Sequence, residues 1–529
     1  MVVVVADGVD CVDGACHWTF QTTRFAFVFR YLLGVLLVSD GVFSKEDLTQ
    51  SLVYPTCLCG NGRVEFGCIV VVVVFNPTDV RIAQITTQFK DKTRIVLCGM
   101  GGSSLGPEVI ALTYKKDIFI FDSTDPNYAR HAIGTDLTHT LVVVSSKSGS
   151  TIETSSQRSL FQGQFQAAGL NPLDHMLFVT DPGSPLDKEV RSSGYSVLNA
   201  DPNVGGRFSV LSAFGLVPSA LIGAPIKEIL DDASAEKNAF LQDDQVILDV
   251  AYLLVTQAEQ YIAFTDAGSH VPGLSDWIEQ LIAESTGKDS IGRLPIATED
   301  VARARVGGAF TVAYSGSGAD LTVEGSLGAH FIFWEWVTAL IGAALKIDPF
   351  NQPNVTEAKE QTAAALTEWN NVVPVLTPAC TDKSVEIFGD GQSLKDALAT
   401  FIEDVKDGGY IAIMAYLDRR DDVKIAELRA ILAEKSARPT SFGWAPRFLH
   451  STGQFHKGGQ KNGSFLQITG ETSIDYAIPG RDFSLRTLLF AQAIGDNRAL
   501  ATRKYPLLRL HLQNRKAGID EILAAARSL

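Results

Sequence analysis

Hydroxyl groups gather in one short stretch of the sequence, Ser145–Thr151, which also contains Lys147. The apolar run before it, residues 141–144, is typical of a buried strand. Ser150 and Glu153 have the spacing of a capping box, so we expect a helix to begin there. A strand that enters a helix through such a loop directs backbone N–H groups, hydroxyls and the positive end of a helix dipole at one point, and these groups bind phosphate. The alternative is an ordinary turn whose hydroxyls lie in water.

Two glycine-rich loops are suited to meet this stretch. The first, residues 99–107, follows an expected strand. In the second, residues 203–209, two glycines precede Arg207, so that the backbone can approach a ligand while the guanidinium group lies beside it. A solvated arginine on a surface turn is an equally good interpretation of Arg207 when this loop is taken alone.

Dinucleotide binding is the main alternative for the first of these loops. Gly99 and Gly101, with Asp122 at the end of the next expected strand, follow the start of a dinucleotide fingerprint. The third glycine of that fingerprint is missing, because Ser104 occupies its position. A sugar phosphate suits the site better, since Gly102 and the hydroxyl-rich loop would then face one crevice. A P-loop nucleotide site is excluded because the sequence contains no GxxxxGK[ST] motif.

A carboxylate and an amide share one face of an expected helix further along the chain. Residues 275–284 are expected to form this helix, and Gly287 to end it. Gln280 and Glu284 lie one turn apart on a face that also carries Trp277. A glutamate on an otherwise apolar face either meets a partner or lies in a cleft. Without further information, a solvated glutamate at a helix end is the commoner case.

Short apolar runs alternate with helical segments along most of the chain, which predicts an α/β fold with parallel, doubly wound sheets. In such sheets the ligand lies at the carboxyl ends of the strands. We expect a first domain at residues 79–225 with the phosphate-binding loops, and a second at residues 226–529 with the glutamate and the C-terminal helices. The clearest expected strands are residues 93–98, 118–121, 141–144, 410–416 and 464–469.

Charge and cysteine content exclude several classes of function. The 529 residues carry a net charge of −15, which argues against a general binder of nucleic acid or of anionic membranes. Only Cys98 and Cys380 of the seven cysteines fall in residues 79–529, as expected in a reducing cytoplasm. Because neither a CxxC pair nor an HExxH motif occurs, we expect no zinc site of the structural or protease type.

Residues 1–78 differ from the rest of the chain. They contain five of the seven cysteines and two runs of valine. Cys57, Cys59 and Cys68 only weakly indicate a metal, because no second ligand pair accompanies them. We expect an atypical N-terminal segment of unknown role, either divergent or wrongly predicted. Limited proteolysis would then leave a stable fragment that begins at about residue 76.

Five motifs, taken together and in order, resemble one family of enzymes. They are GMGGSSLGPEV, SSKSGSTIET, GGRFSVLSAFGL, AESTGK and FNQPNVTEAK. The family is that of the glucose-6-phosphate isomerases, which consist of two sugar-isomerase (SIS) domains. The resemblance runs from about residue 79 to the C-terminus. Two later motifs, LHSTGQFHKGG and GSFLQITG, resemble the isomerase part of transaldolase–phosphoglucose isomerase fusions.

This resemblance implies a pair of doubly wound, flavodoxin-like SIS domains. It also implies a cytoplasmic enzyme of glycolysis and gluconeogenesis that interconverts glucose 6-phosphate and fructose 6-phosphate through an enediol intermediate. The expected partner is a small sugar phosphate, without metal or organic cofactor and without nucleic acid or membrane, and a homodimer is compatible with the family.

The resemblance also assigns roles to residues. Glu284 stands at the position of the catalytic base and Gln280 at that of a substrate-binding glutamine. A single carboxylate can transfer a proton between C2 and C1 of the sugar, and Arg207 is our choice to stabilise the enediolate oxygen. Gln352 and Lys359 match a glutamine and a lysine of the family, the lysine assisting ring opening or binding hydroxyls, although a solvated helical lysine is the simpler reading. The other residues expected to hold the substrate are Gly102, Ser103, Ser146, Lys147, Ser148, Thr151 and Gly206.

The ring-opening histidine is where the sequence departs from the family. That histidine normally lies between the base and the glutamine–lysine segment, yet residues 285–329 contain none. His456 or His450 could replace it from the later loop, and we prefer His456 because glycines follow it. A structural role for either histidine is about equally well supported.

Two alternatives to a glucose-6-phosphate isomerase remain open. One is an isomerase that also accepts mannose 6-phosphate, and the other is a SIS-domain protein that binds a phosphosugar without turnover. Glu284 distinguishes the second from an enzyme, because Glu284→Gln would abolish turnover in an enzyme and leave the ligand affinity of a sensor unchanged.

Overall fold

The computed structural model describes residues 11–12, 15–16, 52–56, 69–73, 80–256 and 260–529. Most of the N-terminal segment, with Cys57, Cys59 and Cys68, lies outside these residues, and its role stays a prediction. The described parts of the segment form two short antiparallel ladders. Their strands are β1 (Cys11–Val12), β2 (Ala15–Cys16), β3 (Leu52–Thr56) and β4 (Ile69–Val73).

The first sheet consists of five parallel strands in the order β6-β5-β7-β8-β9. Their bounds are β5 (Arg94–Cys98), β6 (Phe119–Phe121), β7 (Thr140–Ser145), β8 (Met176–Thr180) and β9 (Ser196–Asn199). This is the flavodoxin-like order, in which the winding of the chain reverses between β5 and β7. The loops that follow these two strands therefore open onto one crevice. The predicted doubly wound sheet is confirmed.

Helices cover both faces of the first sheet, because successive residues of a strand point to opposite sides. Val96 and Val144 pack on one face with α5, α6 and α7, whereas Leu97 and Val143 pack on the other with α3 and α8. The helices of this part are α3 (Val80–Gln88), α4 (Leu105–Thr113), α5 (Pro126–Ile133), α6 (Ile152–Ala167), α7 (Pro185–Ser192) and α8 (Ala213–Leu221).

The second sheet is small, parallel and ordered β11-β10-β12-β13. Its strands are β10 (Tyr261–Thr265), β11 (Leu294–Ala297), β12 (Phe310–Ala313) and β13 (Leu321–Thr322). The helices packed around it are α9 (Ile226–Gln242), α10 (Gln245–Thr256), α11 (Leu274–Thr286) and α13 (Leu327–Leu345). Helix α11 begins and ends close to the bounds predicted for the glutamate-bearing helix, and Gly287 follows it as predicted.

Helix α13 forms the centre of the core around the second sheet. It is long and apolar enough to cross a membrane, but 72% of its apolar window is buried inside the protein, as in the core helix of a soluble protein. Trp334 packs edge-to-face on Phe264 of β10, and Phe331 packs in the same way on Trp277 of α11. The core thus fixes α11, which carries Gln280 and Glu284, against the second sheet.

The third sheet has six strands in the order β14-β15-β19-β18-β16-β17, the last four parallel and the first two antiparallel. Its strands are β14 (Cys380–Asp382), β15 (Val385–Phe388), β16 (Tyr410–Tyr416), β17 (Thr440–Trp444), β18 (Gly463–Gly470) and β19 (Leu507–Leu512). Helices α15 (Leu394–Glu403), α16 (Glu427–Ser436) and α19 (Arg515–Arg527) cover one face, and α17 (Gly453–Gly458) and α18 (Leu485–Ala501) cover the other.

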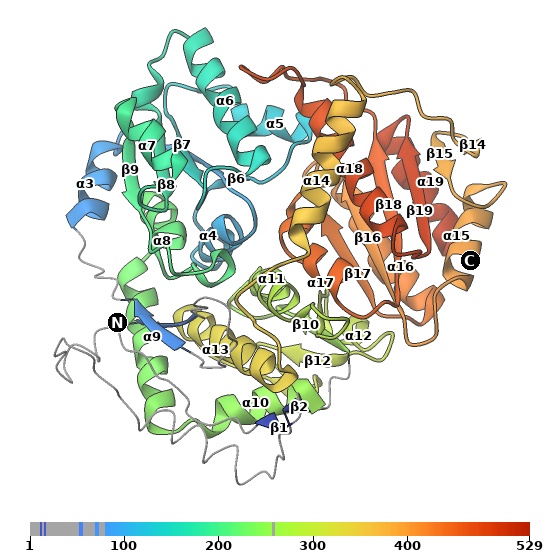
Figure 1. Cartoon of the computed structure of the whole chain (residues 1–529), viewed down its shortest axis with the longest axis horizontal. Helices are drawn as coiled ribbons and strands as arrows, with labels where there is room; N and C mark the ends of the chain where they lie inside the picture. Colours follow the sequence, from blue (N-terminus) through green and yellow to red (C-terminus); the bar gives the residue numbers. More distant parts are fainter. Residues whose placement is uncertain (1–10, 13–14, 17–51, 57–68, 74–79, 257–259) are drawn as a thin grey trace.

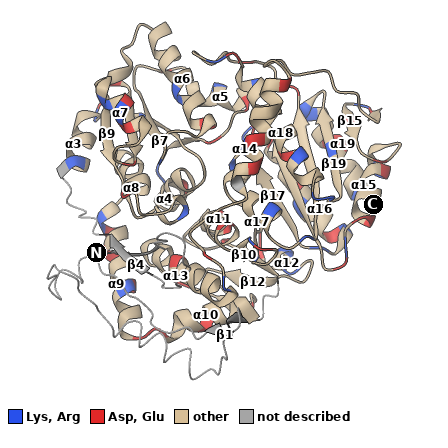
Figure 2. Ribbon diagram, viewed as in Figure 1, with Lys and Arg blue, Asp and Glu red and all other residues tan. Residues whose placement is uncertain are grey.

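Figure 1 shows how the three sheets are arranged. The first sheet and the third sheet lie side by side, and the second sheet with α9, α10 and α13 lies below them in this view. Helix α14 (Val355–Glu368) packs along α18. In Figure 2, basic and acidic residues are both scattered over the helices of the described part of the chain.

The predicted division into domains at residues 79–225 and 226–529 stays a prediction. The first sheet falls within the predicted domain 79–225, but residues 226–529 contain two separate sheets. The strands of the smaller sheet are two to five residues long, and such short apolar runs do not stand out in a sequence.

Candidate active site

Two loops and one helix meet at the carboxyl end of β5. The turn η1 (Gly101–Ser103) follows β5, and η3 (Gly206–Phe208) lies against it. A Cβ atom on Gly102 would lie 2.0 Å from the carbonyl oxygen of Gly206, so only glycine allows this approach. Gly101 has φ of +55°, and a Cβ atom there would lie 2.7 Å from Nε2 of Gln280 on α11. These glycines therefore bring the loops of the first sheet against α11.

Glu284 and Arg207 form a buried ion pair where these elements meet. Oε1 of Glu284 lies 3.3 Å from Nη1 of Arg207, and the two side chains are 12% and 2% exposed. Burial lowers the pKa of Arg207, and the negative charges of Glu284 and Asp348 act against this effect. The guanidinium therefore remains a cation beside the carboxylate.

Arg207 is fixed by hydrogen bonds on every side. Its Nε donates to Oγ of Ser285 at 2.7 Å, and Nη1 donates to Oε1 of Gln352 at 3.0 Å. Its Nη2 donates to the carbonyl oxygens of Pro349 at 2.5 Å and Asn351 at 3.0 Å. The predicted residues Arg207, Glu284 and Gln352 are thus brought together.

Gln280 links Glu284 to the loop that carries His450. Its Nε2 donates to Oε2 of Glu284 at 3.1 Å and to the carbonyl oxygen of His450 at 2.9 Å. The spacing of Gln280 and Glu284, one helical turn apart, places both side chains at the same spot, as the sequence predicted.

His450 ends the turn η5 (Arg447–His450) and faces Glu153 on α6. Its Nε2 lies 3.0 Å from Oε1 of Glu153, which also accepts a hydrogen bond from Nε2 of Gln492 at 2.7 Å. Burial acts to raise the pKa of Glu153, but the charge of His450, its hydrogen bond and the more distant charge of Lys359 outweigh burial and hold this pKa below its usual value. Lys359 itself is an exposed residue of α14.

The capping box predicted from Ser150 and Glu153 is wrong. Helix α6 begins at Ile152 with Thr151 as its N-cap, and no side chain caps it. The side chain of Glu153 turns inward to His450, because a buried histidine supplies a stronger partner than a backbone N–H group at the helix end. The contact of Glu153 with His450 could not be predicted from sequence spacing, since the two residues are 297 positions apart.

The structure does not bring His456 to the site. Its side chain is buried within α17, 3% exposed, with Nδ1 2.9 Å from the hydroxyl oxygen of Tyr410. Burial, and to a lesser degree the charge of Lys457, lower the pKa of His456 to about 3. The glycines after it serve packing, because a Cβ atom on Gly458 would lie 2.5 Å from the carbonyl oxygen of Gly287.

The hydroxyl-rich loop after β7 closes through its own hydrogen bonds. The N–H group of Gly149 donates to Oγ of Ser146 at 3.1 Å, and Oγ of Ser148 lies 2.7 Å from Oγ of Ser150. Lys147 turns to Asp181, whose Oδ2 lies 2.9 Å from its Nζ. The loop leads directly into the first turn of α6, which carries Glu153, the residue that contacts His450.

Lys288 is a buried cation near this site that the sequence analysis did not consider. It follows Gly287 in the motif AESTGK, is 3% exposed and donates to the carbonyl oxygen of Asp348. Burial, and then the charge of Arg207, lower its pKa to about 7. The available signal in the sequence was that Lys288 belongs to this motif. Glu153 was singled out only as a capping residue.

The site combines a parallel sheet of flavodoxin-like order with a glutamate on a helix from the next sheet. Residues 82–292 match the family model of phosphoglucose isomerase. The predicted resemblance to glucose-6-phosphate isomerases is thereby confirmed for this part of the chain, whereas the likeness to the fusion proteins stays a prediction.

Relatives of known name agree with this match. A probable glucose-6-phosphate isomerase of Haloquadratum walsbyi is 31% identical over 225 residues, which are 41% of this chain and 52% of the relative. The glucose-6-phosphate isomerase of Campylobacter jejuni is 34% identical over 219 residues, which are 38% of this chain and 53% of the relative. The chain thus spans about half the length of the curated relatives it matches.

A solved structure shows the same fold. The crystal structure of a glucose-6-phosphate isomerase from Chlamydia trachomatis aligns with a TM-score of 0.50 at 21% sequence identity, covering 62% of this chain and 83% of that one. The predicted fold class is therefore confirmed over more than the segment that the family model matches.

Proposed function

We propose that the protein is an aldose–ketose isomerase that interconverts glucose 6-phosphate and fructose 6-phosphate. The observation that carries this proposal is the buried pair of Glu284 and Arg207, placed where the glycine loop after β5 meets α11. A carboxylate held beside a fixed guanidinium is what proton transfer through an enediolate requires. The match of residues 82–292 to phosphoglucose isomerase supports it.

In this mechanism Glu284 removes the proton from C2 of the open-chain sugar and returns it to C1. The electrons of the broken C–H bond move toward the C1 carbonyl oxygen, where negative charge develops. The proton of the C2 hydroxyl passes to this oxygen, so that protonation of C1 leaves a carbonyl group at C2. Arg207 is poised to stabilise that charge without reorganising, because its other N–H groups are held by protein acceptors. Gln280 and Gln352 would orient the reacting end of the sugar through their amides.

The phosphate group would bind at the loop after β7, through the hydroxyls of Ser146, Ser148 and Thr151 and the N-terminus of α6. Lys147 would contribute charge from its position beside Asp181. Gly102 and Ser103 would contact sugar hydroxyls, and Gly206 would allow the sugar to approach. This arrangement holds the reacting carbons over Glu284.

For ring opening we assign His450 in preference to His456. His450 has a carboxylate partner in Glu153 and touches Gln280 through its carbonyl group, so it is oriented and adjacent to the base. Lys359, whose charge acts on Glu153, would assist from α14. His456 forms a hydrogen bond with Tyr410 and is buried in the core, so that it cannot contact the sugar. A cytoplasmic location and a homodimer are further parts of the proposal and rest on the family alone.

A coupled assay tests the proposal. It supplies fructose 6-phosphate and follows glucose 6-phosphate, with mannose 6-phosphate as the comparison substrate. We expect turnover of fructose 6-phosphate, and a loss of about 10²–10⁴-fold in kcat for Glu284→Gln with phosphosugar binding retained. Turnover of mannose 6-phosphate at a similar rate would identify the dual isomerase. Binding without turnover in the unaltered protein would identify a sensor and end the proposal.

Glu279→Gln is a matched control on the same helix. Glu279 is 9% exposed, and burial, with a smaller contribution from the charge of Asp276, raises its pKa to about 8. Its Oε1 accepts from the N–H group of Ala297, away from Arg207. Because this carboxyl group is largely protonated at neutral pH, an amide replaces it closely, and we expect normal activity.

A further inference from the structure

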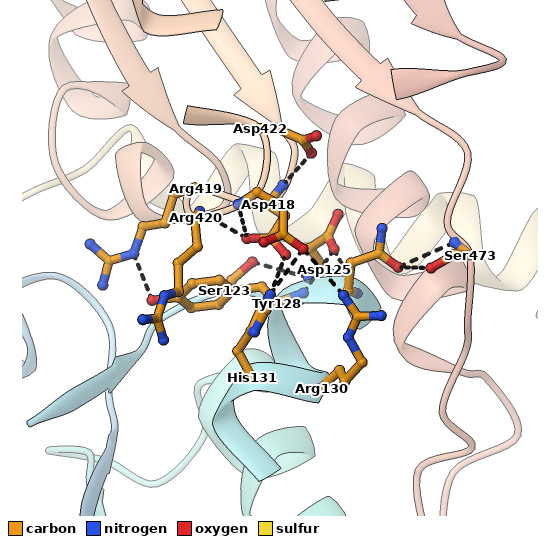
Figure 3. A network of polar contacts seen from close by, with 12 residues as sticks. Ser123, Asp125, Tyr128, Arg130, His131, Asp418, Arg419, Arg420, Asp422 and Ser473 are labelled. Carbon is orange, nitrogen blue, oxygen red and sulfur yellow. Dashed lines mark hydrogen bonds and ion pairs between the residues drawn. The ribbon is translucent and has the colours of Figure 1, made fainter. Parts of the chain in front are cut away.

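Ligand-type side chains form a second cluster where α5 of the first sheet meets the loop after β16. His131 lies on α5, and Asp418 and Asp421 lie in that loop. Nε2 of His131 is 3.1 Å from Oδ2 of Asp421 and 3.4 Å from Oδ2 of Asp418. Figure 3 shows His131 pointing from its helix toward the loop of Asp418. The proposed isomerase mechanism does not use any of these residues.

Asp418 has a buried carboxylate oxygen that accepts no hydrogen bond and lies beside the imidazole of His131. The residue is 0% exposed, and its Oδ1 accepts from the N–H groups of Arg420 at 2.8 Å and Asp421 at 3.2 Å. Its Oδ2 is buried, accepts no hydrogen bond and faces Nε2 of His131. A buried carboxylate oxygen without a hydrogen bond is costly, so this oxygen is suited to a cation.

The three atoms lie close enough together to reach one metal ion. The atoms lie within 4.8 Å of one another, and they form the one such group among the described residues. Zinc binds imidazole nitrogen and carboxylate oxygen at about 2.0–2.2 Å in tetrahedral geometry, which separates neighbouring ligand atoms by about 3.3–3.5 Å. The separations of 3.1 and 3.4 Å at His131 are close to this range.

The charges around the cluster favour a divalent cation. Arg515 pairs with Asp125 at 2.6 Å and with Asp422 at 2.9 Å. Arg130 reaches Asp421 at 3.2 Å. Four carboxylates, including Asp418, thus face two guanidinium groups.

The neighbouring arginines do not change this balance, because their guanidinium groups are engaged elsewhere. Arg419 pairs with Glu108 at 2.7 Å, and Arg420 lies over the ring of Phe119 at 5.4 Å. The loop itself follows β16, next to the point where the winding of the third sheet reverses between β16 and β18. Ligands collect at such switch points.

We propose that His131, Asp418 and Asp421 bind one divalent transition-metal ion of the zinc type, with water as the fourth ligand. The hydrogen bonds to Oδ1 of Asp418 are the supporting contacts that orient a metal-binding carboxylate. Because α5 belongs to the first sheet and the aspartates to the third, the ion joins the two parts of the molecule and is structural.

Cobalt(II) tests the site, since four-coordinate Co²⁺ absorbs in the visible range and substitutes for zinc. The full chain is stripped with a chelator and titrated with Co²⁺ without sugar phosphate, and Zn²⁺ is then added to displace it. We expect the absorption to saturate at one Co²⁺ per chain, and added Zn²⁺ to raise the Tm. His131→Gln and Asp421→Asn should each weaken Co²⁺ binding about tenfold or more and remove the rise in Tm.

His139→Gln is the matched control. His139 also faces an aspartate, Asp136, at 2.8 Å, but both side chains are 55% exposed and no third ligand accompanies them. Binding that is unchanged in His131→Gln, or lost equally in His139→Gln, would overturn the proposal, as would the absence of tetrahedral Co²⁺ absorption. His131 is partly exposed, so its variant should fold, and circular dichroism checks this. Because the readouts do not involve turnover, the result is independent of the isomerase assay.

Discussion

Replacing Arg207 by lysine keeps a positive charge beside Glu284 but removes the planar set of donors that holds this charge in place. The guanidinium lies 3.3 Å from Oε1 of Glu284 and donates to Ser285, to Gln352 and to two backbone carbonyls. An ammonium group keeps the positive charge, but its three donors radiate from one nitrogen atom. At least two of the acceptors around it would therefore lose their hydrogen bonds.

The expected effects follow from those contacts. Each buried acceptor left without a partner costs about 1–3 kcal/mol, so we expect Arg207→Lys to lower the free energy of unfolding by about 2–5 kcal/mol. The charge would no longer be fixed where the enediolate oxygen develops, and loss of one such group lowers kcat by about 10²–10³-fold. The KM for fructose 6-phosphate should change less, because the phosphate site that we propose is another loop, the one after β7.

Steady-state kinetics and urea unfolding measure these two effects separately. Arg293→Lys is the control, because the Arg293 side chain is also buried and donates to the carbonyl oxygens of Leu254, Val255 and Gly292 without a carboxylate partner. It should lose stability in the same way and keep its kcat. A kcat for Arg207→Lys within fivefold of the unaltered protein would refute the role given to the guanidinium.

Three further predictions concern other buried groups. His450→Gln should lower kcat about 10²-fold or more for ring-closed substrate. His456→Gln should reduce stability in urea and leave kcat unchanged. Equal losses of kcat in the two variants would contradict the assignment of ring opening to His450. Because the pKa of Glu153 is lowered in the folded protein, its ionisation stabilises the fold above the pKa of the unfolded chain, about 4.3, and this contribution disappears as the pH falls through the folded value. Glu153→Gln should therefore flatten the loss of unfolding free energy between neutral and acid pH, and an unchanged profile would show that the pair with His450 does not contribute. Both carboxyl oxygens of Glu335 are buried without a hydrogen bond, and burial raises the pKa of this group well above the usual value. Glu335→Leu should therefore raise the free energy of unfolding by about 1–3 kcal/mol. A decrease in the free energy of unfolding would indicate a partner for this group.

The first sheet and its loops were predictable because their signals are local. The runs at β5 and β7 are continuously apolar, as expected for strands covered on both faces, and glycines follow where the backbone must approach a neighbour. Glu284 and Gln280 could be paired because one helical turn separates them. Sequence spacing decides such contacts directly.

The contacts that the sequence did not predict join segments far apart in the chain. Glu153 has the spacing of a capping residue, but His450 competes for its carboxylate from 297 positions away. His456 has glycines beside it because α17 packs closely on the end of α11, which from sequence cannot be told from a flexible catalytic loop. His131 and Asp421, 290 positions apart, form no recognisable metal motif.

The pairing of Glu153 with His450 means that the proposed activity depends on the assembly of different parts of the molecule. Glu153 comes from the first sheet, Glu284 from a helix of the second, and His450 from a loop of the third, and Gln280 touches two of them. In the proposed mechanism, a chain in which only the first sheet had formed could hold a phosphate but could not move a proton. Turnover would then begin only when all three parts have docked, and a protein with a loosened junction would bind a sugar phosphate and leave it unchanged.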